Sequence, residues 1–94
     1  MIDLMPHEKV LRGSWVKWAG QMMADGVCRR IDALINTRLQ PIATRDAGWI
    51  KLFRDPQDDR LWEHSYPQGE MHGGGPPMLR WLSYDDVSVL YGPV

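Results

Sequence analysis

The side chains of this sequence that could perform chemistry gather near residue 70. Glu70 and His72 lie two residues apart and are followed by Gly73, Gly74 and Gly75. A carboxylate and an imidazole at this spacing could act as general acid and base. Histidine before three glycines is also typical of the oxyanion loop of lipases and esterases, but their Gly-x-Ser-x-Gly nucleophile turn is absent from the sequence. A small ligand-binding domain or a hydrolase-like enzyme that uses this loop is therefore one alternative for the function.

The same segment favours a structural role more strongly. Pro76 and Pro77 follow the glycines, lack backbone N–H groups and prevent the helix start that a phosphate-binding loop requires. We expect a stiff loop that passes close to other backbone. The three histidines and the single cysteine are scattered, with no His-x₃-His or Cys-x₂-Cys spacing. The sequence therefore predicts no metal site, no cofactor and no catalytic residue.

The elements that position this loop begin with a helix over residues 25–38. Asp25 is a favourable N-cap, and Pro41 makes continuation of the helix unfavourable. Apolar residues between them recur at helical spacing and form one stripe. A short second helix is predicted over residues 83–91, because Ser83 and Asp86 resemble the start of a capping box. The stripe of the first helix consists of Val27, Ile31, Leu34, Ile35 and Leu39.

Strands joined by short turns account for most of the remaining sequence. Ala19-Gly20 predicts a turn within the first hairpin, and residues 55–59 predict a turn within the second. The elements follow one another as strand-strand-helix-strand-strand-strand-helix, without a regular βαβ alternation. We therefore predict an α+β fold with an antiparallel sheet built from hairpins, in one domain over residues 1–94. The predicted strands are residues 10–18, 21–23, 49–54, 61–66 and 78–82.

Composition and charge exclude several classes of function. The 94 residues carry 11 basic and 12 acidic side chains, for a net charge of -1. This balance argues against a nucleic-acid binder that depends on phosphate neutralisation. No run of apolar residues exceeds three, so neither a membrane helix nor a signal-peptide core is predicted. A single cysteine cannot form an internal disulfide, which favours a cytoplasmic location.

Aromatic and acidic side chains of the second hairpin form a candidate binding surface. The chain has five tryptophans, and we expect one or two aromatic side chains to be partly exposed, with Trp62 and Tyr66 the best candidates. Both residue types are enriched at binding hot spots. Asp58, Asp59 and Glu63 lie close by in sequence and could steer a basic partner. A solvated turn is the alternative interpretation of this acidic segment.

Several stretches of the sequence together resemble a known family. They are Gly48-Trp49, residues 52–56 (Leu-Phe-Arg-Asp-Pro), residues 60–63 (Arg-Leu-Trp-Glu) and residues 66–77 (Tyr-Pro-Gln-Gly-Glu-Met-His-Gly-Gly-Gly-Pro-Pro). With Gly13-x-Trp15, Asp25 and Arg30-Ile31, they make the chain similar to the immunity protein 27 family of bacterial polymorphic toxin systems. Asp59 departs from the pattern where a turn glycine is common, and Gly69 departs where a small polar residue is common. Both departures concern loop conformation.

The resemblance implies a non-enzymatic inhibitor that binds and neutralises a toxin domain, typically encoded beside it. It transfers no contact residue to this chain, so the contact set is our own inference. A structural adaptor or a homo-oligomeric subunit is a third class of function, and the choice between monomer and homodimer stays open. The residues that we expect at the toxin interface are Asp58, Asp59, Trp62, Glu63, Tyr66, Glu70 and His72, with Gly73, Gly74, Gly75, Pro76 and Pro77 shaping the loop.

Overall fold

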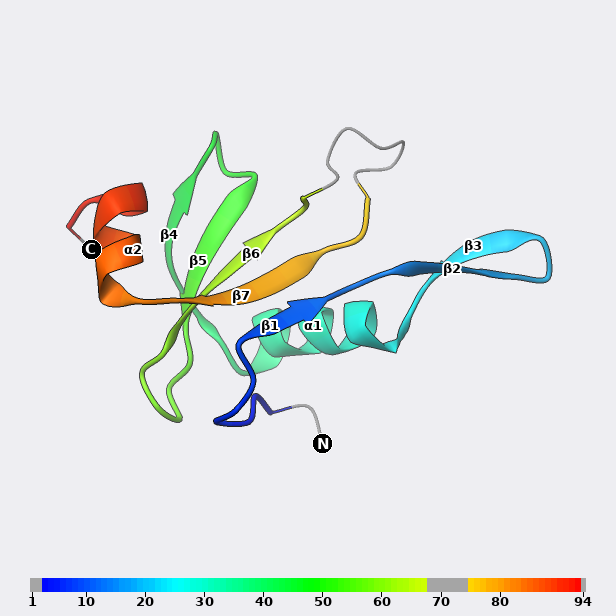
Figure 1. Cartoon of the computed structure of the whole chain (residues 1–94), viewed down its shortest axis with the longest axis horizontal. Helices are drawn as coiled ribbons and strands as arrows, with labels where there is room; N and C mark the ends of the chain where they lie inside the picture. Colours follow the sequence, from blue (N-terminus) through cyan, green and yellow to red (C-terminus); the bar gives the residue numbers. More distant parts are fainter. Residues whose placement is uncertain (1–2, 68–74, 94) are drawn as a thin grey trace.

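The computed structural model describes residues 3–67 and 75–93, with only the backbone described at Trp18. Within these residues the chain forms strands in antiparallel pairs and two helices, which confirms the predicted α+β fold (Figure 1). The strands are β1 (Val10–Arg12), β2 (Trp15–Trp18), β3 (Gln21–Ala24), β4 (Gln40–Arg45), β5 (Ile50–Arg54), β6 (Leu61–Ser65) and β7 (Met78–Leu82). The helices are α1 (Gly26–Thr37) and α2 (Tyr84–Tyr91).

Both helices start at the predicted capping residues. The Asp25 carboxylate accepts the Cys28 backbone N–H at 2.9 Å, and the Ser83 hydroxyl accepts the Asp86 backbone N–H at 3.1 Å. These side chains satisfy first-turn N–H groups that have no partner within a helix. Gly92, with φ 74°, ends α2 in a conformation that favours glycine. Neither helix of the described part is long and apolar enough to cross a membrane.

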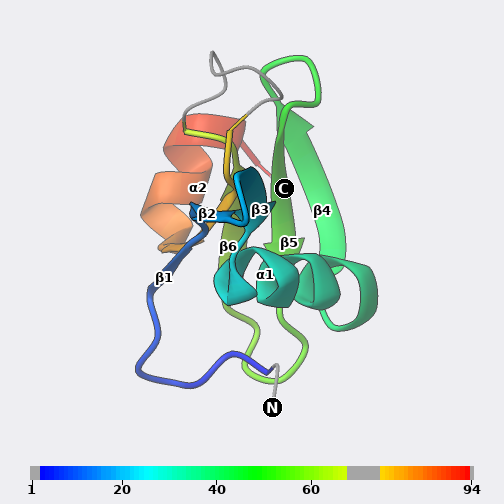
Figure 2. The same ribbon diagram turned by 90° about the vertical axis from the view of Figure 1, so that its right-hand side faces the viewer.

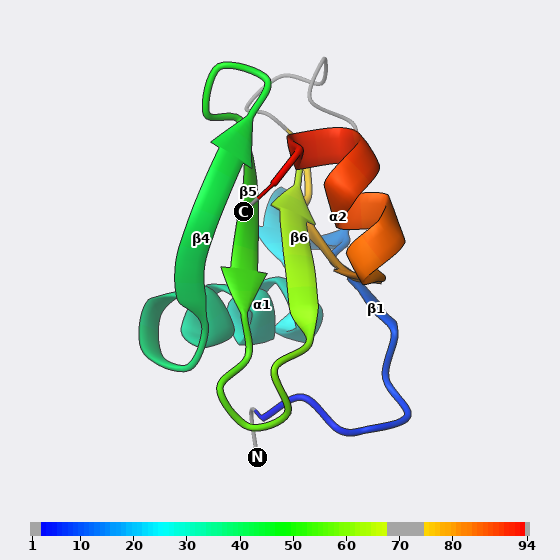
Figure 3. The same ribbon diagram turned by 90° about the vertical axis from the view of Figure 1, so that its left-hand side faces the viewer.

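The main sheet has the strand order β1-β7-β6-β5-β4, and all of its neighbouring strands are antiparallel. Helix α1 lies against one face of this sheet and α2 lies against the other face (Figures 2 and 3). Because successive side chains of a strand point to opposite faces, neighbouring residues of β5 and β6 enter two different cores. Strand β6 is the central strand, so its side chains are covered from both sides.

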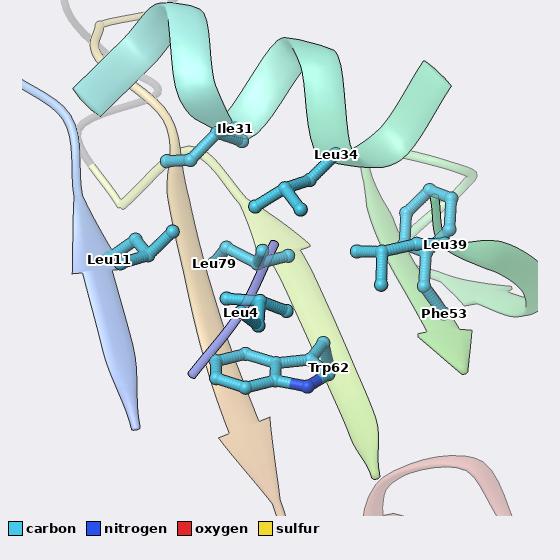
Figure 4. Packing of buried hydrophobic residues seen from close by; sticks show 8 residues of the cluster. All are labelled: Leu4, Leu11, Ile31, Leu34, Leu39, Phe53, Trp62 and Leu79. Carbon is cyan, nitrogen blue, oxygen red and sulfur yellow. The ribbon is translucent and has the colours of Figure 1, made fainter. Parts of the chain in front are cut away.

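The core beneath α1 is built around the Trp62 side chain. Ile31 and Leu34 of α1 pack with Phe53 of β5, Trp62 of β6 and Leu79 of β7 (Figure 4). Burial of each such side chain stabilises the fold by about 1.5–3 kcal/mol relative to exposure. The apolar stripe predicted from the sequence is therefore what attaches α1 to the sheet. Leu4, Leu11 and Leu39 complete this cluster.

The core beneath α2 is smaller. Val87 of α2 packs with Leu52, Leu61 and Leu82, which come from three neighbouring strands. Tyr91, in the last turn of α2, packs against the same cluster. Because α2 has only eight residues, it covers only part of this sheet face.

Strand β4 is the element that the sequence analysis missed. It pairs with β5 at the edge of the main sheet, and the register shifts between Pro41 and Ala43. A proline lacks the N–H that a central strand needs, but an edge strand with a bulge accommodates it. The helix ends before Pro41, as predicted. The prediction of no strand between this helix and residue 49 is wrong.

The prediction of a single strand over residues 10–18 is also wrong. Strand β1 pairs with β7, whereas β2 pairs with β3 in a separate hairpin that projects from the main sheet (Figure 1). Between β1 and β2 the Gly13 N–H donates to the Pro77 carbonyl at 2.8 Å. A Cβ at Gly13 would lie 2.5 Å from the Cys28 Sγ, so only glycine fits where the chain passes between Pro77 and Cys28. We call this point the β1–β2 crossing. The hairpin turn predicted at Ala19-Gly20 is confirmed.

Candidate functional site

The sheet face that carries α2 is open beyond the end of that helix. A pocket of about 530 Å³ lies there, with Ile50, Ser65 and Met78 from β5, β6 and β7 among its lining residues. The strand register explains the grouping, because Ser65 is paired with Met78 across β6 and β7. We call this the Arg45–Arg80 pocket. It is lined by Arg45, Asp46, Trp49, Ile50, Glu63, Ser65, Tyr66, Pro67, Met78 and Arg80.

A buried carboxylate separates this pocket from the α2 core. Glu63 is 1% exposed, and its Oε1 accepts hydrogen bonds from Arg80 Nε at 3.2 Å and Nη2 at 3.0 Å. Its Oε2 accepts from Arg45 Nε at 3.1 Å and from the Tyr91 hydroxyl at 2.8 Å. The register places Glu63 opposite Arg80, so the central strand delivers the acid to the arginine directly. Three of these hydrogen bonds hold Arg45 and Arg80, which line the pocket, and the fourth holds Tyr91 in the last turn of α2.

The electrostatics of this cluster keep Glu63 charged. Burial by itself raises the pKa of the Glu63 carboxyl, but the hydrogen bonds from Arg45, Tyr91 and Arg80 outweigh burial and hold that pKa below its ordinary value. Burial and the hydrogen bond to Glu63 raise the pKa of Tyr91 to about 12. A carboxylate held by two guanidinium groups and a phenol has its acceptor sites occupied. The arrangement therefore suits rigid positioning of the arginines better than acid–base chemistry at Glu63.

Two aromatic side chains stand at the rim of the pocket. Trp49, which is 70% exposed, follows the turn between β4 and β5, and Tyr66, 38% exposed, follows the end of β6. The turn has three successive residues in the left-handed region, Asp46 (φ 55°), Ala47 (φ 56°) and Gly48 (φ 88°). Its backbone is closed by the Trp49 N–H, which donates to the Asp46 carbonyl at 3.1 Å. This short turn projects Trp49 into solvent.

Trp49 and Tyr66 also border a second hollow, of about 450 Å³, whose other lining residues include Lys51 and His64. The His64 ring meets the Tyr66 ring edge to face at 5.1 Å between centroids. Burial lowers the pKa of His64, Asp32 opposes this effect and Lys51 adds to it. Within the described residues the His64 Nε2 is buried without a hydrogen-bond partner. The two rim aromatics thus separate two hollows at one end of the main sheet.

The structure places the predicted contact residues in three different environments. Trp62 is 0% exposed and Glu63 is 1% exposed, so the expectation that Trp62 is partly exposed is wrong, and Glu63 is not part of an acidic surface. The reason is that β6 is the central strand of the sheet. Tyr66 is partly exposed as expected. Asp58 and Asp59 are exposed in the β5–β6 turn, at the end of the strands opposite Tyr66.

The acidic turn is compensated by arginines of its own neighbourhood. Asp58 accepts a hydrogen bond from Arg60 Nε at 2.7 Å, and Asp59 pairs with Arg54. Asp59 has φ 62°, a conformation that glycine adopts more readily. Surface ion pairs of this kind contribute little to stability. They also reduce the negative electrostatic potential that the turn presents to a partner.

The predictions for the Gly-rich loop are tested only at its end. Glu70, His72, Gly73 and Gly74 lie outside the described residues. Gly75 has φ 73°, and the Pro77 carbonyl accepts the N–H described above at the β1–β2 crossing. Pro76 and Pro77 line a small hollow beside that crossing. Within residues 3–67 and 75–93, no group of three or more histidine, cysteine or acidic side chains could hold a metal ion.

Sequence reasoning missed three side chains of the Arg45–Arg80 pocket. Trp49 was assigned to a strand, although its position directly after a turn is a signal for exposure. Arg45 belongs to the strand that was not predicted, and Arg80 converges with it on Glu63 only through the strand order. This convergence has no signature in local sequence.

In the described part of the chain, which has an α+β architecture, two helices enclose a five-stranded antiparallel sheet and one sheet face keeps an open pocket with aromatic side chains at its rim. The family model for Immunity protein 27 matches residues 18–83, which is more than half of the chain. The chain belongs to the Immunity protein 27 family. The matched span runs from the end of β2 to the N-cap of α2 and contains every residue that lines the Arg45–Arg80 pocket. Comparison with curated proteins and with solved structures gave no match.

Proposed function

We propose that this protein is an immunity protein that binds a cognate polymorphic toxin domain and inhibits it without catalysis. The observation that carries the proposal is the family match over residues 18–83. We further propose that residues 1–94 act as one domain, in the cytoplasm, on a protein partner and not on nucleic acid or a membrane.

The geometry supports binding as the mode of action. A standard interface buries about 800 Å² per partner, which is a modest share of the 6189 Å² that this chain exposes. Trp49 is 70% exposed and Tyr66 is 38% exposed, so two large aromatic side chains at one end of the main sheet are available as anchors. The sheet that carries them is held from both faces by buried cores, so little ordering of the backbone is required on binding.

The acidic contact set remains part of this proposal in a reduced form. Asp58 and Asp59 are exposed and could steer a basic toxin surface, although both are paired with arginines. Glu70 and His72 stay candidate contacts from the sequence. If Asp58 and Asp59 steer association, their replacement by asparagine lowers the association rate and flattens its dependence on salt. An unchanged rate would identify the segment as a solvated turn.

The decisive experiment is a calorimetric titration with a toxin domain. The titrant is the C-terminal domain of a large secreted protein encoded next to this chain, prepared as a catalytically inactive variant. We expect a one-to-one complex with Kd near 1 nM, equivalent to roughly -12 kcal/mol, and restored growth when this chain is co-expressed with the active toxin. The control is an unrelated toxin domain of similar charge. A folded cognate domain that is toxic but does not bind would refute the proposed function.

A further inference from the structure

The two arginines of the Arg45–Arg80 pocket have donor capacity that the fold does not use. Arg45 donates only its Nε to Glu63, and Arg80 donates Nε and Nη2 to the same carboxylate. Among residues 3–67 and 75–93 the remaining guanidinium nitrogens make no further hydrogen bond, although the Arg45 guanidinium also lies 5.7 Å from the centre of the Tyr91 ring. The arginine side chains are 30% and 41% exposed, whereas the side chain of Glu63 is only 2% exposed. The pocket therefore presents cationic donors, and the acid that holds them is withdrawn behind them.

We propose that the Arg45–Arg80 pocket receives an acidic side chain of the cognate toxin, with Trp49 covering its apolar stem. This inference rests on the proposed function and adds the surface and the chemistry of the partner. Guanidinium groups bind carboxylates through paired, charge-assisted hydrogen bonds, and Glu63 holds both arginines in place before the partner arrives. Ile50 and Met78 supply apolar lining for the methylene groups of an aspartate or glutamate.

Asp46 allows a test of whether the side chain that occupies the pocket is acidic or basic. It also lines the pocket, at the rim formed by the β4–β5 turn. An acidic occupant must direct its carboxylate to Arg45 and Arg80, and Asp46 opposes it weakly from the solvent side. A basic occupant would instead pair with Asp46 and be repelled by the arginines. The two possibilities therefore predict opposite effects for Asp46→Asn.

The test compares Kd values for the inactive toxin domain used in the calorimetric titration. Trp49→Ala should weaken binding by about 30-fold, as expected for a central aromatic anchor. Arg45→Lys keeps a positive charge beside Glu63 but loses the planar fork, and should weaken binding by about 10-fold. Asp46→Asn should leave Kd unchanged or lower it. Tyr84→Ala is the matched control, because Tyr84 and Trp49 are both 70% exposed but Tyr84 lies on α2.

Each outcome separates the inference from the proposed function. If the wild-type chain does not bind the toxin domain, the proposed function is refuted and the inference falls with it. If the wild type binds but Trp49→Ala and Arg45→Lys stay within about twofold of it, only the inference is overturned. Weaker binding by Asp46→Asn would indicate a basic occupant and overturns it too. Micromolar binding of free N-acetyl-L-glutamate that leaves the toxin complex unaffected would also overturn the inference, because the pocket would then be a small-molecule site.

Thermal melting of each variant guards against a misleading loss of binding. Arg45→Lys changes a hydrogen-bond donor to Glu63 and could lower stability, whereas Trp49 and Asp46 lie at the rim and, within the described residues, make no hydrogen bond to the Glu63 carboxylate. If Arg45→Lys melts well below the wild type, the comparison of Trp49→Ala with Tyr84→Ala decides alone. Equal Kd values for these two variants would overturn the inference.

Discussion

Replacing Glu63 by glutamine is the sharpest test of how the sheet is held together. The substitution keeps the size of the side chain but removes its charge and one of its acceptor oxygens. Arg45 and Arg80 then face each other without the anion between them, and an amide NH₂ group meets a guanidinium donor. The Tyr91 hydroxyl also loses a charged acceptor at 2.8 Å, so the last turn of α2 loses its polar attachment to β6.

The magnitude follows from the burial of the acid and the exposure of its partners. Removing one member of a buried ion pair costs about 3–5 kcal/mol when the remaining charge stays buried. Here both arginines are 30% or more exposed and regain water, so we expect about 2–3 kcal/mol. For a domain of this size that corresponds to a fall in Tm of about 10–20 °C. Tyr91→Phe removes one of the hydrogen bonds and should cost about 1 kcal/mol.

The measurement is thermal and urea unfolding of the wild type and both variants, followed by far-ultraviolet circular dichroism and tryptophan fluorescence. Glu8→Gln is a suitable reference, because Glu8 also holds an arginine through two hydrogen bonds but is 17% exposed. We expect that reference to cost about 1 kcal/mol. If Glu63→Gln melts within about 3 °C of the wild type, the four hydrogen bonds contribute little and the reasoning fails.

Other predictions concern acid stability and backbone crowding. The hydrogen bond from Arg30 lowers the pKa of Glu8 from 4.5 to about 2. The Glu8–Arg30 pair therefore contributes about 1 kcal/mol of stability, which is present above pH 4.5 and lost as the pH falls toward 2. Urea midpoints from pH 2 to 7 should show this loss in the wild type and a smaller one in Glu8→Gln. Gly13→Ala should cost about 2–3 kcal/mol, because its Cβ would lie 2.5 Å from the Cys28 Sγ. Gly26→Ala, with no atom closer than 3.9 Å, should be neutral or stabilise by about 0.5–1 kcal/mol; equal melting of the two alanine variants would contradict this contrast.

Local patterns were sufficient for the elements whose signals are local. The apolar stripe and the Asp25 cap give α1, and Ser83 gives the start of α2, because capping and helical periodicity depend on residues within a few positions. Strand β4 escaped detection because Pro41 is normally evidence against a strand, and only its edge position and bulge accommodate it. The break at Gly13 was missed because β1 and β2, which belong to two different sheets, are separated in sequence by only Gly13 and Ser14.

The candidate site could be predicted only in part because it depends on strand order. Tyr66 was expected to be exposed and is, but Trp62 shares its alternation pattern and lies in the centre of the sheet. Alternation assigns side chains to a face and does not say whether a helix covers that face. Glu63 was assigned to an acidic surface for the same reason. The arginines that hydrogen-bond to its carboxylate, Arg45 and Arg80, come from β4 and β7.

The crowded crossing at Gly13 has a consequence for how unfolding could be followed. The chain has one cysteine, Cys28, and its thiol is 3% exposed and donates to the Ser14 carbonyl at 3.5 Å. Burial raises the pKa of this thiol, and the Asp25 carboxylate raises it further, so little reactive thiolate forms in the folded state. A thiol reagent can therefore modify the protein only when α1 separates from the β1–β2 crossing. The native sequence thus contains an intrinsic reporter, and its labelling rate in the presence and absence of a partner measures how strongly binding closes this part of the fold.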